Sequence, residues 1–173
     1  MARYLAGEHA AGRLAGVIGL GGSGGTALLA AGFAALPVGV PKMIVSTMAS
    51  GRVDGYVGAT DLILVPSLVD VAGLNRVLRP ILRRAAAAMA GMVLAPTAGD
   101  ETNGKPVVGM TMFGVTTPSV TGMRGIVEVE GWEPMVFHAT GTGGKIMERL
   151  VASGSIAGVI DATTTEVADE IVG

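Results

Sequence analysis

The sequence predicts a mixed α/β protein of doubly wound parallel sheets, arranged in three layers and divided into two Rossmann-like lobes. Short apolar runs alternate with longer helical patterns along the chain, which is typical of parallel sheets with helical crossovers. Only 3% of the 173 residues are aromatic, so the core must be built from Ala, Val, Leu, Ile and Met. A polar, glycine-containing stretch over Ala98–Lys105 is the best linker between the lobes.

The first lobe covers residues 1–104. Its predicted elements are, in order, a helix over Ala2–Arg13, a strand over Val17–Gly19, a helix over Gly25–Leu36, strands over Lys42–Ser46 and Asp61–Val65, and a long helical segment over Asp70–Met92. Pro37 ends the second helix, and Pro80 must either kink the last segment or begin a new helix there.

The second lobe covers residues 105–173. Its predicted elements are, in order, a strand over Pro106–Val115, a helix opened by Thr116-Thr117-Pro118, a strand over Pro134–His138, a helix over Lys145–Ala152, a strand over Ile156–Ile160 and a helix over Thr165–Ile171. Thr117 is the expected cap of the first of these helices, with Pro118 in its first turn.

A glycine-rich turn between the first strand and the helix that follows it organises the first lobe. Gly19, Gly21 and Gly24 fit the spacing G-x-G-x-x-G. Glycines there let the backbone approach a ligand closely, and the helix start behind them offers free N–H groups and a positive dipole end. A phosphate is the ligand that such a turn most often holds. The alternative is that these glycines only allow the helix to pack on the strand.

The second lobe repeats this arrangement. The turn Gly141–Gly144 precedes a helix, and the next strand ends in the hydroxyls of Thr163 and Thr164, just as the strand after the first turn ends in Ser46 and Thr47. Glycine turns and hydroxyls would thus gather at the carboxyl ends of strands, where open α/β sheets bind ligands. The two halves could face one another across one cleft, or the echo could reflect only the general likeness of βαβ units.

Six longer motifs resemble one family. They are Gly19–Thr26, Val45–Gly51, Ala72–Asn75, Gly109–Pro118, Phe137–Gly141 and Asp161–Glu166. Together they resemble the largely uncharacterised bacterial and plant family that includes the ATP-binding domain of the tomato tobamovirus-resistance protein. The resemblance covers nearly the whole chain. It implies an ATP-binding, two-lobed α/β protein that tends to dimerise, and it implies no known reaction.

Members of that family begin earlier and continue further than this sequence. The chain therefore resembles a central fragment of the family, which leaves open whether either lobe and the nucleotide site are complete. A sheet that lacks an edge strand exposes unpaired backbone groups, which favours association with another chain.

Individual residues near these turns favour some ligands and catalytic roles over others. The first turn is followed by Thr26 and lacks a Walker lysine, although Lys145 follows Gly144 directly. An NAD site would need an acidic residue about 20 positions beyond the turn, where the sequence has Ser46. His138 stands at a strand end, as a base or as a structural residue. Four acidic residues are candidate magnesium ligands, and Asp161 is the best placed because it ends a strand. For the others, Glu166, Asp54 and Asp61, helix capping or loop solvation is the favoured alternative.

Composition excludes several partners. The net charge of −2 gives no electrostatic reason to expect nucleic acid. Without cysteine the chain has no disulfide or thiolate chemistry, and its two histidines show no metal-ligand spacing. No signal peptide or membrane-spanning run is visible, so we expect a cytoplasmic protein away from the membrane. Many small apolar residues and few charges predict a homo-oligomer, at least a dimer.

Two function classes remain. The first is an adenine-nucleotide-binding protein of unknown reaction, with ATP as the ligand, accompanied by Mg²⁺; whether it is an enzyme stays open. The second is a dimeric binding or assembly module without catalysis. For the first, the predicted ligand-binding residues are Gly21, Gly22, Ser23, Gly24, Gly25, Thr26, Ser46, Thr47, Ser50, Gly141, Gly143, Gly144, Thr163 and Thr164.

Overall fold

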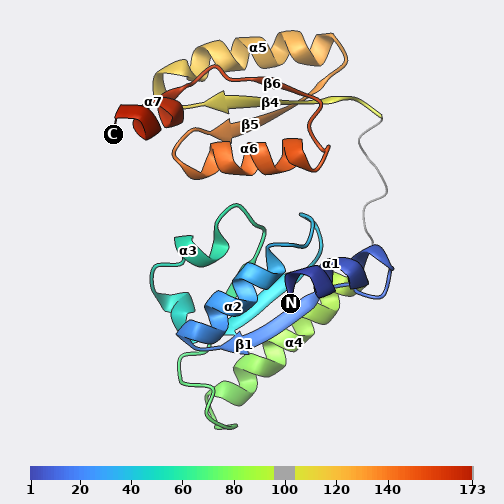
Figure 1. Ribbon diagram of the computed structural model, residues 1–173, viewed down its shortest axis with the longest axis vertical. Coiled ribbons are helices and arrows are strands. Elements are labelled where there is room, and N and C mark those ends of the chain that lie inside the picture. The colour runs from blue at the N-terminus through green and yellow to red at the C-terminus, as the bar shows by residue number, and fades with distance from the viewer. Residues whose placement is uncertain (96–103, 173) are drawn as a thin grey trace. The chain divides into compact units, whose positions relative to one another are not determined.

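The computed structural model describes residues 1–95 and 104–172. The chain divides into two compact units, Met1–Thr97 and Ala98–Gly173, and each is described by itself (Figure 1). Most of the predicted linker over Ala98–Lys105 lies outside the described residues.

The first unit contains a three-stranded parallel sheet in the order β1-β2-β3. Its elements are α1 (Ala2–Ala10), β1 (Val17–Gly21), α2 (Ser23–Phe33), β2 (Lys42–Ser46), the 3₁₀ turn η1 (Thr47–Ser50), α3 (Asp54–Val57), β3 (Ile63–Pro66) and α4 (Leu78–Leu94). The register places Gly21 beside Ser46, so the ends of β1 and β2 meet at one edge of the sheet.

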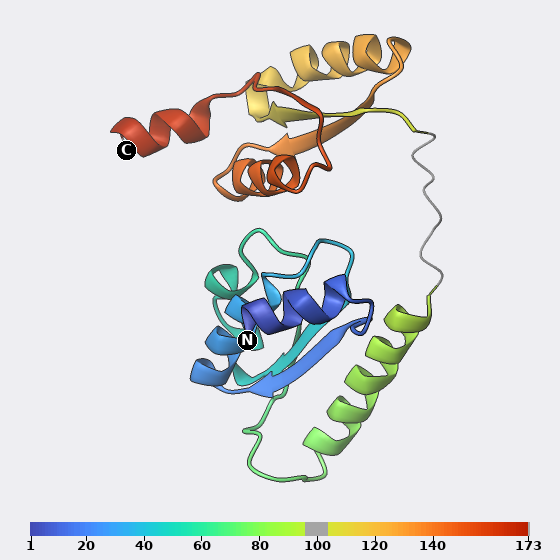
Figure 2. The same cartoon turned by 45° about the vertical axis from the view of Figure 1, so that its right-hand side comes forward.

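Helices cover both faces of this sheet. α1 and α2 lie on one face and α4 lies on the other (Figure 2). Alternate side chains of a strand point to opposite faces. Ile44 therefore packs with Phe33 of α2, and Met43 and Val45 pack with Met89 of α4. The central strand β2 is buried over its whole length, as expected for a strand covered on both sides.

The second unit contains a three-stranded parallel sheet in the order β5-β4-β6. Its elements are β4 (Val107–Met112), the short 3₁₀ turn η2 (Gly114–Thr116), α5 (Thr117–Val129), β5 (Glu133–His138), α6 (Thr142–Ala152), β6 (Gly158–Ile160) and α7 (Thr165–Val172). α5 and α6 lie on opposite faces of the sheet (Figure 1). The two parallel, helix-covered sheets confirm the predicted fold class.

Two element predictions need correction. The segment Asp70–Val77 is irregular, and α4 begins only at Leu78. Gly73 has a φ of +92°, which breaks a helix, and the Asn75 side chain accepts hydrogen bonds from the backbone N–H groups of Val77 and Leu78. Pro80 then lies in the first turn of α4, where its missing N–H costs nothing.

The first strand of the second unit is also shorter than predicted. β4 ends at Met112, and the chain turns at Gly114, whose φ is +45°. The Thr116 hydroxyl accepts a hydrogen bond from the Phe113 N–H, so the residues after Met112 form a capped turn.

In the described ranges, no helix combines the length and apolar character that crossing a bilayer requires.

Candidate functional site

The glycine turn of the first unit joins β1 to α2 at the carboxyl edge of the sheet. Gly21 ends β1, and Gly22 is the N-cap of α2, with φ −84° and ψ −158° and no side-chain hydrogen bond at the cap. A Cβ on Gly21 would lie 3.0 Å from the backbone of Gly25, whereas one on Gly24 would meet nothing within 4 Å. Gly21 therefore permits close packing of the turn, and the turn around Gly24 is open on its outer side.

The buried hydroxyls of Thr26 and Ser46 form hydrogen bonds that hold this turn in place. Both residues are buried, and their hydroxyl oxygens lie 2.6 Å apart. Thr26 Oγ1 also donates to the carbonyl oxygen of Gly22 at 2.7 Å, and Ser46 Oγ accepts from the Met48 N–H at 2.9 Å. The pair fixes the start of α2 against the end of β2.

The other predicted residues of the first unit lie on the same edge. Ser23 is exposed in the first turn of α2, Thr47 is half-buried and Ser50 is exposed in η1. The Cβ position of Gly22 lies 3.7 Å from Thr47 Oγ1. Leu68, after β3, has a φ of +62°, a strained value for a bulky residue. The predicted glycines and hydroxyls of the first unit thus lie at one strand edge. Two of the hydroxyls, those of Thr26 and Ser46, are hydrogen-bonded to each other inside the protein.

In the second unit a cavity of about 590 Å³ opens at the carboxyl edge of the sheet. β5 follows β4 in the chain and lies on one side of it, whereas the next strand, β6, lies on the other side of β4. The strand order therefore reverses between β4 and β6. Ligands of open α/β sheets bind at such reversal points. Residues from β4, α6 and α7 and from the β6–α7 connection line the cavity, among them Thr111, Gly144, Lys145, Asp161 and Thr163.

Hydrogen-bonded threonine hydroxyls connect the strand ends at this edge of the sheet. Thr111 Oγ1 donates to Asp161 Oδ1 at 2.5 Å and accepts from the Thr163 N–H at 3.0 Å. The hydroxyls of Thr163 and Thr116 lie 2.6 Å apart. The network ties β4 to the β6–α7 connection. Thr164, the neighbouring predicted residue, is exposed.

The second glycine turn carries a carboxylate. Glu166 Oε1 accepts hydrogen bonds from the backbone N–H groups of Gly141 and Gly144, at the N-terminus of α6. Gly141 is the N-cap of α6 with a φ of +92°, and Gly143 and Gly144 are buried in its first turn. The sequence identifies this turn, but it gives no sign that Glu166 reaches it, because the two lie 22 to 25 positions apart.

The remaining candidates divide between the two units. Lys145 is exposed beside the second-unit cavity. His138 ends β5, and its ring contacts Phe113 edge-on, with ring centres 5.4 Å apart. Asp161 is held by Thr111, and Asp61 pairs with a lysine at the opposite, amino edge of the first sheet. Asp61 is therefore engaged as a structural partner.

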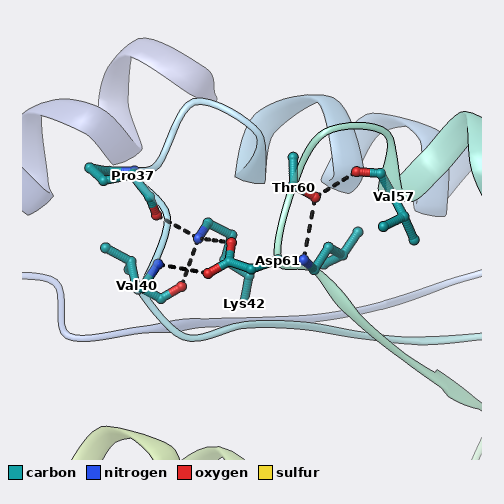
Figure 3. A network of polar contacts seen from close by, with 8 residues as sticks. Pro37, Val40, Lys42, Val57, Thr60 and Asp61 are labelled. Carbon is teal, nitrogen blue, oxygen red and sulfur yellow. Dashed lines mark hydrogen bonds and ion pairs between the residues drawn. The ribbon is translucent and has the colours of Figure 1, made fainter. Parts of the chain in front are cut away.

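That lysine, Lys42, is a buried charged residue whose structural role the sequence did not indicate. Its side chain is fully buried, and Nζ donates to the Pro37 carbonyl at 2.6 Å, the Val40 carbonyl at 2.8 Å and Asp61 Oδ1 at 2.6 Å (Figure 3). Burial would raise the pKa of Asp61, but hydrogen bonds from Lys42 and the Gly39 N–H together outweigh it and lower that pKa. The only signal in the sequence is a lysine at the start of an apolar strand.

Comparison with known proteins gives a consistent result. Residues 1–98 match the model described as "Uncharacterised protein family (UPF0261) N-terminal domain", and residues 105–173 match its C-terminal domain. The chain is 56% identical over 164 residues to the ToMV resistance protein Tm-1 of Solanum lycopersicum, covering 92% of this chain and 22% of that protein. It is 52% identical over 160 residues to a UPF0261 protein of Rhizobium meliloti, covering 92% of this chain and 39% of that protein.

A UPF0261 protein of Clostridium tetani is 49% identical over 162 residues, again with 92% of this chain and 39% of that protein covered. The chain thus spans about a fifth of the tomato relative and about two fifths of these bacterial ones.

Proposed function

The chain belongs to the uncharacterised protein family UPF0261, and from that premise we propose that it binds an adenine nucleotide, with the phosphates on the turn Gly22–Gly25 at the start of α2. The observation that carries the proposal is the N-terminus of α2: it follows a parallel strand at the carboxyl edge, its cap is a glycine, and no side chain of the described residues accepts a hydrogen bond from the N–H groups of Ser23, Gly24 or Gly25. The family resemblance of the sequence motifs supports ATP as the nucleotide.

The residues present fit a phosphate group. The first N–H groups of a helix have no partner within the helix, and with the helix dipole they favour an anion. Gly24 and Gly25 are exposed and carry no Cβ that could screen these groups. Ser23 adds an exposed hydroxyl. The turn Gly22–Gly25 would hold the phosphates, while the buried Thr26–Ser46 pair keeps the turn in place.

The two glycine turns of the chain differ in one informative way. In the second unit the Glu166 carboxylate accepts from the N–H groups at the start of α6. At the start of α2, no carboxylate of the described residues accepts a hydrogen bond from the N–H groups of Ser23, Gly24 or Gly25. Because an internal anion already serves the second turn, the turn of the first unit is the better position for an external phosphate.

ATP carries more negative charge than backbone N–H groups alone neutralise well, so Mg²⁺ would accompany it. We assign no reaction to this site. None of the contacts described above at Gly22–Gly25 pairs a nucleophile with a base.

A second candidate function, a dimeric assembly module without catalysis, is favoured by one observation. Ile18 and Leu20 of β1 are 42% and 46% exposed on the face that α4 covers. Within the described residues β1 pairs with β2 alone, so it is an edge strand. A second copy that covers this edge would remove apolar side chains and backbone groups from water.

Calorimetry with Mg·ATP tests the nucleotide proposal on Gly22→Val. The φ of Gly22 is open to any residue, and its Cβ position meets only Thr47 Oγ1 at 3.7 Å, so the fold should persist while the branched side chain covers the phosphate position. Gly91→Val on α4 is the matched control, because its Cβ position is also free. We expect binding to be lost in Gly22→Val alone. Equal affinity in the parent and both variants would contradict the proposal.

A further inference from the structure

The N-terminus of α6 is closed by an anion that the chain supplies itself. Glu166, from the first turn of α7, places its carboxylate on the N–H groups of Gly141 and Gly144, the latter at 3.3 Å. A Cβ on Gly144 would lie 1.9 Å from Glu166 Oε2, so the absence of a side chain at this position makes room for the carboxylate. The arrangement is that of a carboxylate bound as a ligand at a helix N-terminus.

α7 has little apolar packing to hold it in place. Of its described residues, Thr165–Val172, none is buried. Val167 is 53% exposed and Ile171 is 74% exposed. A helix of eight residues without a buried face is marginal in water. The charged contact of Glu166 with α6 is therefore a principal restraint on this helix, and losing it should release the helix.

α7 forms part of the wall of the cavity at the carboxyl edge. α7 contributes five residues to the wall, and α6 contributes its first turn together with Lys145 and Glu148. The five residues of α7 are Glu166, Val167, Asp169, Glu170 and Ile171. Movement of α7 would therefore open the cavity and uncover the first turn of α6 together.

We propose that Glu166 is a reversible latch: while its carboxylate occupies the N-terminus of α6, α7 is docked and the turn Gly141–Gly144 is closed to other anions. When α7 leaves, the same N–H groups bind a small external oxyanion of the phosphate class. Docking of α7 and binding of the oxyanion exclude one another, so each weakens the other by the same factor. This latch lies within the second unit and does not depend on nucleotide binding in the first.

Two substitutions in the full chain should break the contact between Glu166 and the N-terminus of α6, one by changing Glu166 and the other by changing Gly144. Glu166→Ala removes the carboxylate, and Glu170→Ala is the matched control, which removes an equal charge from the same helix and the same cavity wall. Gly144→Ala keeps Glu166 but places a methyl group where its carboxylate lies. The three atoms nearest that methyl position, outside the local helix backbone and the chain neighbours, all belong to Glu166. Gly144→Ala therefore separates the latch from any effect of Glu166 on the dipole of α7.

Amide hydrogen exchange of α7, measured by NMR, reports the docking. A lost charge-assisted hydrogen bond predicts about tenfold faster exchange in Glu166→Ala and in Gly144→Ala, and parent-like exchange in Glu170→Ala. The double variant should match Glu166→Ala, because the methyl group then has nothing to displace. Parent-like exchange in both single variants would overturn the proposal, and so would additive effects in the double variant.

Titration with inorganic phosphate reports the second half of the proposal. In Glu166→Ala the amide resonances of Gly141 and Gly144 should shift saturably, while in the parent and in Glu170→Ala they should shift at least tenfold less at equal phosphate. Phosphate shifts of equal size in all three proteins, or none in Glu166→Ala, would overturn the closure of the turn by Glu166.

Discussion

Replacing Lys42 by Met should destabilise the first unit more than any surface substitution in it. The methylene stem of Met fills nearly the same buried space, so the change removes mainly the ammonium group. That group donates to the carbonyls of Pro37 and Val40 and to Asp61, at 2.6 to 2.8 Å (Figure 3). The side chain of Lys42 is fully buried, whereas that of Asp61 is 35% exposed.

These contacts set the size of the effect. Breaking a fully buried ion pair costs about 3–5 kcal/mol, and a buried carbonyl left without a donor costs about 1–3 kcal/mol. Asp61 regains water because it is partly exposed, which lowers the cost. We therefore expect Lys42→Met to reduce the free energy of unfolding of the first unit by about 2–4 kcal/mol. Asp61→Asn keeps an oxygen that Lys42 can donate to, but it leaves the fully buried ammonium without a counter-charge, so it should cost a similar amount, about 2–4 kcal/mol.

Hydrogen exchange resolved along the chain is the appropriate assay, because it reports each unit separately. Exchange of β1, β2 and β3 should rise strongly in Lys42→Met, while β4, β5 and β6 serve as an internal reference in the same molecule. A loss below about 0.5 kcal/mol in β2 would refute the reasoning, since that is the range of ordinary surface substitutions.

Three further predictions concern the same unit. Because the folded pKa of Asp61 is lowered, its contribution is present above the ordinary carboxyl value of about 4 and is lost as the pH falls below it, so a denaturation series in acid should show a smaller pH-dependent loss in Asp61→Asn than in the parent. Thr26→Val leaves Ser46 without its hydroxyl partner and should cost about 1–2 kcal/mol by hydrogen exchange of α2, with Ser23→Ala as a nearly neutral control. Sedimentation should show a dimer that Ile18→Glu weakens, and a monomeric parent at high concentration would contradict the association.

The sequence predicted most elements because their signals are local. β2 has the predicted bounds, Lys42–Ser46, since Pro41 and a β-branched apolar run define them. Asp70–Val77 was assigned wrongly to a helix because Leu74 and Val77 fit helical spacing, while Gly73 and the capping side chain of Asn75 oppose it. Turn and cap chemistry outweighed periodicity there.

The candidate site shows a different limit. Glycine turns and strand-end hydroxyls could be predicted because topology alone brings them to one edge. Two long-range contacts could not, since nothing local indicates them: Glu166 reaches the start of α6 from another helix, and Lys42 pairs with Asp61 across 19 positions. Whether a glycine turn is open or already holds an internal carboxylate depends on such contacts. For the same reason, the sequence does not show that the Thr26 hydroxyl is already hydrogen-bonded within the protein. Its partner Ser46 lies on the next strand, 20 positions away.

The central claim is that the first helix turn of α2 receives the phosphates of an adenine nucleotide. An amide NMR titration of the full chain with Mg·ATP, and in parallel with adenosine, tests it most directly. We predict saturable shifts of the Gly22, Ser23, Gly24 and Gly25 amides with Mg·ATP and much smaller ones with adenosine, because the N–H groups bind phosphate. Saturable ATP shifts that leave these four amides unchanged, or no shifts at millimolar ATP, would contradict the account.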